Sequence, residues 1–104
     1  MTAILDGYCA AKVPPRAADH LKLKHRVDGL AVYLVESRPR LQQRTSWYDL
    51  DVAKFRYRVK DGSWRLYWSD RNDKWHEDEY RPPAKRFETL LDHVDRDPTG
   101  IYWG

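Results

Sequence analysis

The chain has 104 residues, a formal net charge of +3 and one cysteine, Cys9. We expect residues 1–104 to form a single domain with one core, because this length is too short for two cores and a hydrophobic fraction of 41% is too high for a disordered chain. A lone cysteine cannot form an internal disulfide, and no segment approaches the roughly 20 apolar residues of a membrane span, which predicts a cytoplasmic protein without membrane contact.

The N-terminal segment predicts a short helix from Thr2 to about Ala11. Ile4, Leu5 and Tyr8 recur on one stripe of such a helix. Thr2 can cap its first turn, and a Pro-Pro pair shortly after the stripe ends it.

Residues 21–38 predict a first β-hairpin, because apolar and polar side chains alternate on both sides of Asp28-Gly29. That dipeptide suits a two-residue type I′ turn. Such a turn places Val27 opposite Leu30, and it makes Glu36 project from the apolar face near the end of the second strand.

Residues 38–49 lack periodicity, and we expect the longest loop there. Trp47 lies at its end, beside the loop cations Arg40 and Arg44. Trp and Arg are enriched at interface hot spots, so these three residues are a candidate loop interface. The same loop could instead fold over the edge of the sheet and protect it from pairing.

The most regular alternation lies in residues 53–60, where four apolar residues occupy the odd positions and four cations the even ones: Ala53, Phe55, Tyr57 and Val59, and Lys54, Arg56, Arg58 and Lys60. Asp61-Gly62 again suits a type I′ turn, which predicts a return strand over residues 63–68 with Val59 opposite Trp64. This hairpin has one apolar face and one basic face, and Arg58 faces Arg65 on the basic one.

A polar turn at residues 70–73 leads to a predicted fifth strand over residues 74–79. In this register Trp75 lies on the face of Trp68, and His76 lies on the face of Tyr67. Pro82-Pro83 then prevents further pairing, since proline cannot donate to a ladder.

Apolar residues at positions 87, 90, 91 and 94 predict an amphipathic C-terminal helix. The predicted class is therefore α+β: a short N-terminal helix, a four- to five-stranded antiparallel meander sheet and a C-terminal amphipathic helix on one face. We expect both helices to cover the apolar face and the apolar tail, residues 101–103, to tuck under the sheet.

Five short motifs follow one another along the chain: E-x-R-P at residues 36–39, A-K-x-x-Y at 53–57, W-x-x-Y-W at 64–68, K-W-H at 74–76 and an aromatic-Gly ending at 102–104. With these motifs, residues 21–104 resemble a family of small bacterial proteins, the domain-of-unknown-function family numbered three thousand and twenty-four. The resemblance supports the fold but implies no activity, because the family has none assigned. The chain departs from the family pattern at Asp70 and Asn72, where the family has Arg and Asp.

The basic face is the first candidate site, and its candidate binding residues are Lys54, Arg56, Arg58, Arg65, Tyr67 and His76. Opposed like charges are unfavourable in a sheet unless an anion lies nearby. A nucleic-acid backbone or an acidic protein surface would supply that anion. Alternatively, the acidic residues 77–79 neutralise the face internally, with Asp78 pairing with Arg65.

Glu36 and Arg38 are a candidate structural ion pair at a strand end. A minor alternative is a metal-dependent hydrolase built on Glu36, Arg38 and Lys54, although the residues before Lys54 are apolar rather than acidic ligands. The histidines share no ligand spacing and Cys9 stands alone. We therefore expect no catalytic residue, no cofactor and no metal.

The leading hypothesis is a non-enzymatic binding module that engages an anionic partner, nucleic acid first, through its basic and aromatic-flanked sheet face. The competing hypothesis is a protein–protein interaction or regulatory protein acting as a homo-oligomer. In that case the aromatic residues form a dimer surface and unpaired strand edges join.

Overall fold

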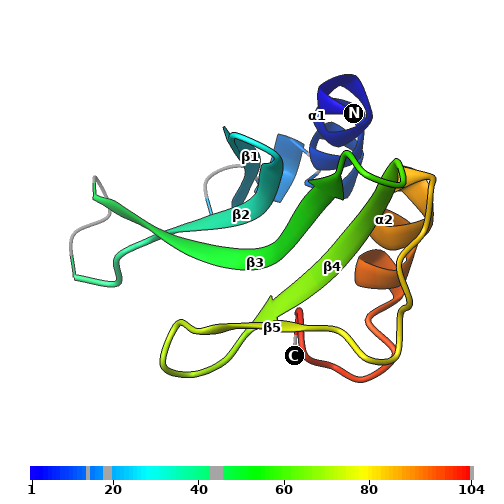
Figure 1. Ribbon diagram of the computed structural model, residues 1–104. Coiled ribbons are helices and arrows are strands. Elements are labelled where there is room, and N and C mark those ends of the chain that lie inside the picture. The colour runs from blue at the N-terminus through cyan, green and yellow to red at the C-terminus, as the bar shows by residue number, and fades with distance from the viewer. Residues whose placement is uncertain (14, 18–19, 43–45, 104) are drawn as a thin grey trace.

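The computed structural model describes residues 1–13, 15–17, 20–42 and 46–103. Figure 1 shows its helices and strands, which are α1 (Thr2–Lys12), the short 3₁₀ helix η1 (Pro15–Ala17), β1 (Lys22–Asp28), β2 (Ala31–Pro39), β3 (Trp47–Arg58), β4 (Ser63–Ser69), β5 (Trp75–Glu77) and α2 (Phe87–Arg96). The strands form one sheet in the order β1-β2-β3-β4-β5, and each is antiparallel to its neighbours. The α+β meander predicted from the sequence is confirmed.

Both helices pack against one face of the sheet, which we call the helix face. Leu34, Phe55 and Leu66 point to this face and are fully buried against Leu5 of α1 and Leu90 of α2. The apolar stripe of α2 faces inward as its spacing predicts. The opposite face, called the open face, carries most of the charged strand residues. No helix in the described part of the chain is long and apolar enough to cross a membrane.

The registers of the first two hairpins differ from the predicted ones by two residues. Val27 pairs with Val32 rather than Leu30, and Tyr57 rather than Val59 pairs with Trp64. In the first hairpin, the turn is centred on Gly29 and Leu30, and only Gly29 has a positive φ, as a type II′ turn requires. The second hairpin has a longer loop that ends at Gly62, whose φ is +65°. A slip of two leaves every side chain on its predicted face.

The register of the fifth strand differs from the predicted one by one residue, so each of its side chains lies on the face opposite to the predicted one. Ser69 pairs with Trp75, so the connection spans residues 70–74 rather than 70–73. The prediction that Trp75 joins the face of Trp68 was therefore wrong, because a slip of one turns every side chain over. His76 pairs with Trp68 on the helix face, and Trp75 lies on the open face with its ring 5.7 Å from that of Tyr33.

A β-bulge in β3 divides that strand into two parts. Leu34 of β2 pairs with Ala53, but the next residue, Val35, pairs with Asp51, so Val52 is the extra residue. Over residues 47–51, which precede the bulge, β3 pairs with β2 alone. β4 pairs with β3 only from Lys54 onward. The first half of β3 and the β4–β5 hairpin therefore diverge, as Figure 1 shows.

The C-terminal tail folds back under the sheet, as predicted. The carboxylate of Asp97 accepts hydrogen bonds from the amides of Tyr102 and Trp103, at 3.1 and 2.8 Å. Tyr102 is buried, and its hydroxyl donates to Asp78 over 2.8 Å. Asp78 also lies 3.2 Å from Nε2 of His93, so one buried carboxylate connects the end of β5, α2 and the tail.

Candidate functional site

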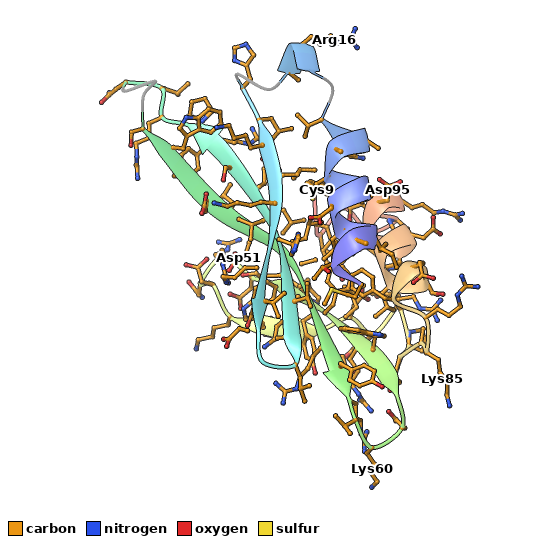
Figure 2. All side chains as sticks on the ribbon, turned by 90° about the horizontal axis from the view of Figure 1, so that it is seen from above. Cys9, Arg16, Asp51, Lys60, Lys85 and Asp95 are labelled. Carbon is orange, nitrogen blue, oxygen red and sulfur yellow. The ribbon has the colours of Figure 1, made fainter. Side chains whose placement is uncertain are left out.

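The open face carries the cations that the alternating pattern predicts. They come from β1, β3 and β4, and they are Lys22, Lys24, Arg26, Lys54, Arg56, Arg58 and Arg65. Figure 2 shows Lys60 at the tip of the β3–β4 hairpin, well away from Asp51 further back along β3. The cations extend along the open face from β1 to the β3–β4 hairpin. The carboxylates near them differ between the end at the hairpin tip and the opposite end.

At the end remote from the hairpin tip, carboxylates neutralise the cations. The bulge turns Asp49 and Asp51 to the open face, where Lys24 lies 2.9 Å from Asp49 and Arg26 lies 3.2 Å from Asp51. Hydrogen bonds from Ser37 and then from Lys24 hold the pKa of Asp49 below its ordinary value. Sequence reasoning did not place these two carboxylates here.

The signal for this arrangement is nevertheless present in the sequence. Apolar residues occupy even positions over residues 48–52 and odd positions from Ala53 onward. The pattern therefore changes phase at Val52-Ala53, and both of these residues are buried. Two adjacent buried side chains within an alternating strand are what a bulge produces.

Nearer the hairpin tip, neutralisation is incomplete. The five residues here, Lys54, Arg56, Arg58, Arg65 and Tyr67, are called the basic patch. Arg56 pairs directly with Arg65, so two guanidinium-bearing side chains oppose each other across the sheet. Arg65 lies 3.3 Å from Glu77, and Arg58 lies 3.9 Å from Asp61. No ion pair of Arg56 or Lys54 occurs within residues 1–13, 15–17, 20–42 and 46–103.

The patch also combines aromatic rings with a shallow hollow. The ammonium group of Lys54 lies over the rings of Tyr33 and Tyr67, 5.7 and 5.4 Å from their centroids. A hollow of about 340 Å³ lies beside the patch, and the exposed apolar residues Leu30 and Val59 form part of its lining. Of the acidic residues 77–79, Glu77 contacts the patch, whereas Asp78 is buried rather than paired with Arg65.

His76 does not belong to this patch, contrary to the prediction. It lies on the helix face, where its ring stacks on Trp68 with centroids 4.7 Å apart. Its Nε2 lies 2.7 Å from Oδ2 of Asp70. This contact, with backbone amides of the turn, lowers the pKa of Asp70 to about 2.

Two residues of the candidate loop interface, Trp47 and Arg40, lie in separate contacts. Trp47 lies on the open face, under the ammonium group of Lys22 at 4.3 Å from the ring centroid. Arg40 lies instead over the ring of Tyr48, at 5.7 Å. Arg44 lies outside the described residues.

Glu36 and Arg38 are in contact on the helix face, and Nε of Arg38 donates to Oε1 of Glu36. The Glu36 side chain is only 9% exposed. The hydrogen bond that Arg38 donates to this carboxylate raises the pKa of Arg38. Lys54 lies on the open face, so the structure does not bring together the three residues of the hydrolase alternative.

A second concave region, which sequence reasoning missed, lies where β3 and the β4–β5 hairpin diverge. It has a volume of about 740 Å³ and is bounded by residues 48–52 of β3, by the β4–β5 hairpin and by tail residues 101–103. We call this cavity the wedge. Glu36 and Arg38 are among its lining residues. The wedge forms where the bulge and the folded tail lie near each other, and no local pattern in the sequence shows that these two segments are close.

Comparison with known proteins gives a family but no function. No curated protein and no solved structure matches the chain. The model of one family, described as a domain of unknown function (DUF3024), matches residues 1–104. This match extends beyond the residues 21–104 over which the motifs resemble the family. The chain belongs to the DUF3024 family.

Proposed function

We propose that the chain is a non-enzymatic binding module whose basic patch contacts the phosphate backbone of a nucleic acid. The observation that carries the proposal is the direct pairing of Arg56 with Arg65. Like charges opposed in a sheet are destabilising unless an anion lies between or beside them. Glu77 contacts one member of this pair, which leaves Arg56 available to an external anion.

The geometry of the patch suits a chain of phosphates better than one isolated anion. Lys54, Arg56 and Arg58 alternate along β3, which spaces them about 6.6 Å apart on one face. A guanidinium group presents donors in a planar fork that matches phosphate oxygens. Tyr67, half-buried beside Lys54, offers a ring on which a base can stack, as in single-strand binders.

The experiment is a titration of labelled single-stranded DNA and RNA 20-mers, followed by fluorescence anisotropy at increasing salt. Four phosphate contacts predict a slope of log K against log salt of about −3. Arg56→Glu should weaken binding by at least about tenfold at low salt. Lys85→Glu is the matched control, because it makes the same charge change at an exposed residue just before α2.

Equal weakening by the two substitutions would indicate only a response to net charge and would contradict the proposal. The absence of binding at low salt would contradict it as well.

A second candidate is self-association through the apolar residues beside the patch. Leu30 and Val59 are 46% and 70% exposed and line the same hollow. A dimer formed there should show a doubled mass by sedimentation, should tolerate salt, and should dissociate in Val59→Lys. Nucleic-acid binding through the basic patch predicts instead an affinity that depends steeply on salt.

A further inference from the structure

The wedge is a different surface from the basic patch, and it supports an inference that goes beyond the proposed function. Its two walls are the first half of β3 and the β4–β5 hairpin, and its floor is the folded tail. Strand pairing between the walls stops at Lys54 and Tyr67. One edge of β3 therefore lines an open cavity over residues 48–51.

The direction of the backbone groups on this edge follows from two hydrogen bonds. The amide of Arg40 donates to Ser46, and the amide of Tyr57 donates to Leu30. Opposed residues in an antiparallel pair alternate between bonded and non-bonded pairs. Counting along the register from the bonded pair of Arg40 and Ser46, every second pair is bonded. Tyr48 and Leu50 belong to such pairs, so their peptide groups point to β2.

The peptide groups of Asp49 and Asp51 consequently point away from β2, toward the wedge. Within the described residues, no backbone hydrogen bond joins this edge to another strand. A strand edge of this kind is a template for an added strand.

The side chains around the edge indicate what kind of strand fits. Leu50 and Tyr48 are 48% and 37% exposed, so apolar side chains of a partner would find uncovered contact area. Carboxylates outnumber arginines in the lining, with Glu36, Asp49, Asp51, Asp70 and Asp73 against Arg26 and Arg38. Although four of these carboxylates already contact cations or a histidine, Asp73 at the β4–β5 turn is exposed.

We propose that the wedge binds an extended peptide segment of another protein, in which apolar residues alternate with Lys or Arg, and that this segment adds to β3 as a strand. The backbone of Asp49 and Asp51 supplies the hydrogen bonds, and the lining carboxylates select basic side chains. A volume of about 740 Å³ lies within the range of sites that enclose a ligand of a few residues.

The same β3 edge of a second copy fits less well. Antiparallel pairing of two β3 edges would bring Asp49 and Asp51 of one copy near the same residues of the other. Like charges opposed across strands are destabilising. The basic peptide has the complementary charge.

The probe is a fluorescein-labelled octapeptide that alternates Lys and Val, titrated with the full chain and followed by anisotropy. Amides of alternate residues lie on opposite edges of an extended peptide. One variant peptide is therefore N-methylated at every Val and another at every Lys. Strand addition predicts that one methylation pattern weakens binding by at least about tenfold while the other leaves it within about threefold.

Protein variants test the same hydrogen bonds from the other side. Asp49→Pro removes an amide that points into the wedge without removing a bond to β2, and edge positions tolerate proline. Asp49→Asn is its control, because it removes the same charge but keeps the amide. We expect Asp49→Pro to bind at least about tenfold more weakly than Asp49→Asn. If Asp49→Pro fails to fold, the methylated peptides still decide the question with the unmodified protein.

The outcomes separate the alternatives. An equal effect of the two methylation patterns, no effect of either, or no binding of the parent peptide would overturn strand addition. Equal binding of a Glu-Val octapeptide would overturn the basic partner. A concentration-dependent dimer that the peptide cannot displace would show that a second copy is the occupant. Arg56→Glu should leave peptide binding within about threefold, so failure here is distinct from failure of nucleic-acid binding.

Discussion

The buried carboxylate of Asp78 gives the sharpest test of how the tail is held. Asp78 is 3% exposed, and it accepts hydrogen bonds from the Tyr102 hydroxyl at 2.8 Å and from the Tyr80 amide at 2.8 Å. Nε2 of His93 lies 3.2 Å away. Because these three groups contact the same carboxylate, Asp78→Ala removes the hydrogen-bond partner of all of them at once.

The expected cost follows from these contacts. A hydrogen bond to a charged group contributes about 1.5–3 kcal/mol, and leaving a buried partner unsatisfied costs a similar amount. We expect Asp78→Ala to lower the free energy of unfolding by about 3 kcal/mol. That is a large part of the roughly 5–15 kcal/mol available to a domain of this size. Asp78→Asn should lose less, since its amide oxygen can still accept from Tyr102.

The assay is urea unfolding followed by tryptophan fluorescence and circular dichroism, with a double-mutant cycle that adds Tyr102→Phe. The two changes should couple by about 1–2 kcal/mol, because either one removes the same hydrogen bond. Asp92→Ala on α2 is the control, and it should change stability by less than about 0.5 kcal/mol because its pair with Arg96 is exposed. If Asp78→Ala costs no more than Asp92→Ala, or if the cycle shows no coupling, Asp78 does not hold the tail in this way.

Three further predictions test other parts of the structure. Phe55→Ala should lower the free energy of unfolding by about 3–5 kcal/mol in the same urea assay, because the ring is fully buried and lies 4.7 Å from that of Phe87; a loss under 1 kcal/mol would contradict this packing. The pKa of Asp70 is lowered from 3.8 to about 2, so its contact with His76 stabilises the fold above pH 4. This contribution to the free energy of unfolding is lost as pH falls toward 2. Acid titration should show the loss, and Asp70→Asn should show less of it. Burial, and then the charge of a neighbouring aspartate, raises the pKa of Cys9, so its thiol should react with a disulfide reagent at pH 8 more slowly in the folded chain than in urea; equal rates would refute its protection.

Local periodicity was sufficient to predict most of the fold. The alternation around Phe55 and the helical spacing that begins at Phe87 both depend on which side of an element is buried, and this can be seen from neighbouring residues alone. Registers could not be predicted as well, because they depend on turn conformation. A slip of two residues at Gly29 and at Gly62 changed the pairing but no faces, whereas a slip of one before Trp75 exchanged them.

The candidate sites likewise include one part that could be predicted from local periodicity and another that could not. The basic patch could be predicted because Lys54, Arg56 and Arg58 share one strand, whose alternation places them together. The wedge could not, because it forms only where the bulge at Val52 lies near a tail from the far end of the chain, and no local pattern shows that these two segments are close. The buried position of Asp78 could not be predicted either, since a charged residue among other charged residues gives no local sign of burial.

The bulge at Val52 has an electrostatic consequence for the molecule as a whole. One strand carries two carboxylates before this residue and three cations after it, all on the same face of the sheet. Since Lys24 and Arg26 pair with the two carboxylates, the open face is nearly neutral at one end of β3 and positive at the other. The field of any charged surface therefore exerts a torque on the protein, which turns the β3–β4 loop toward negative charge before contact is made.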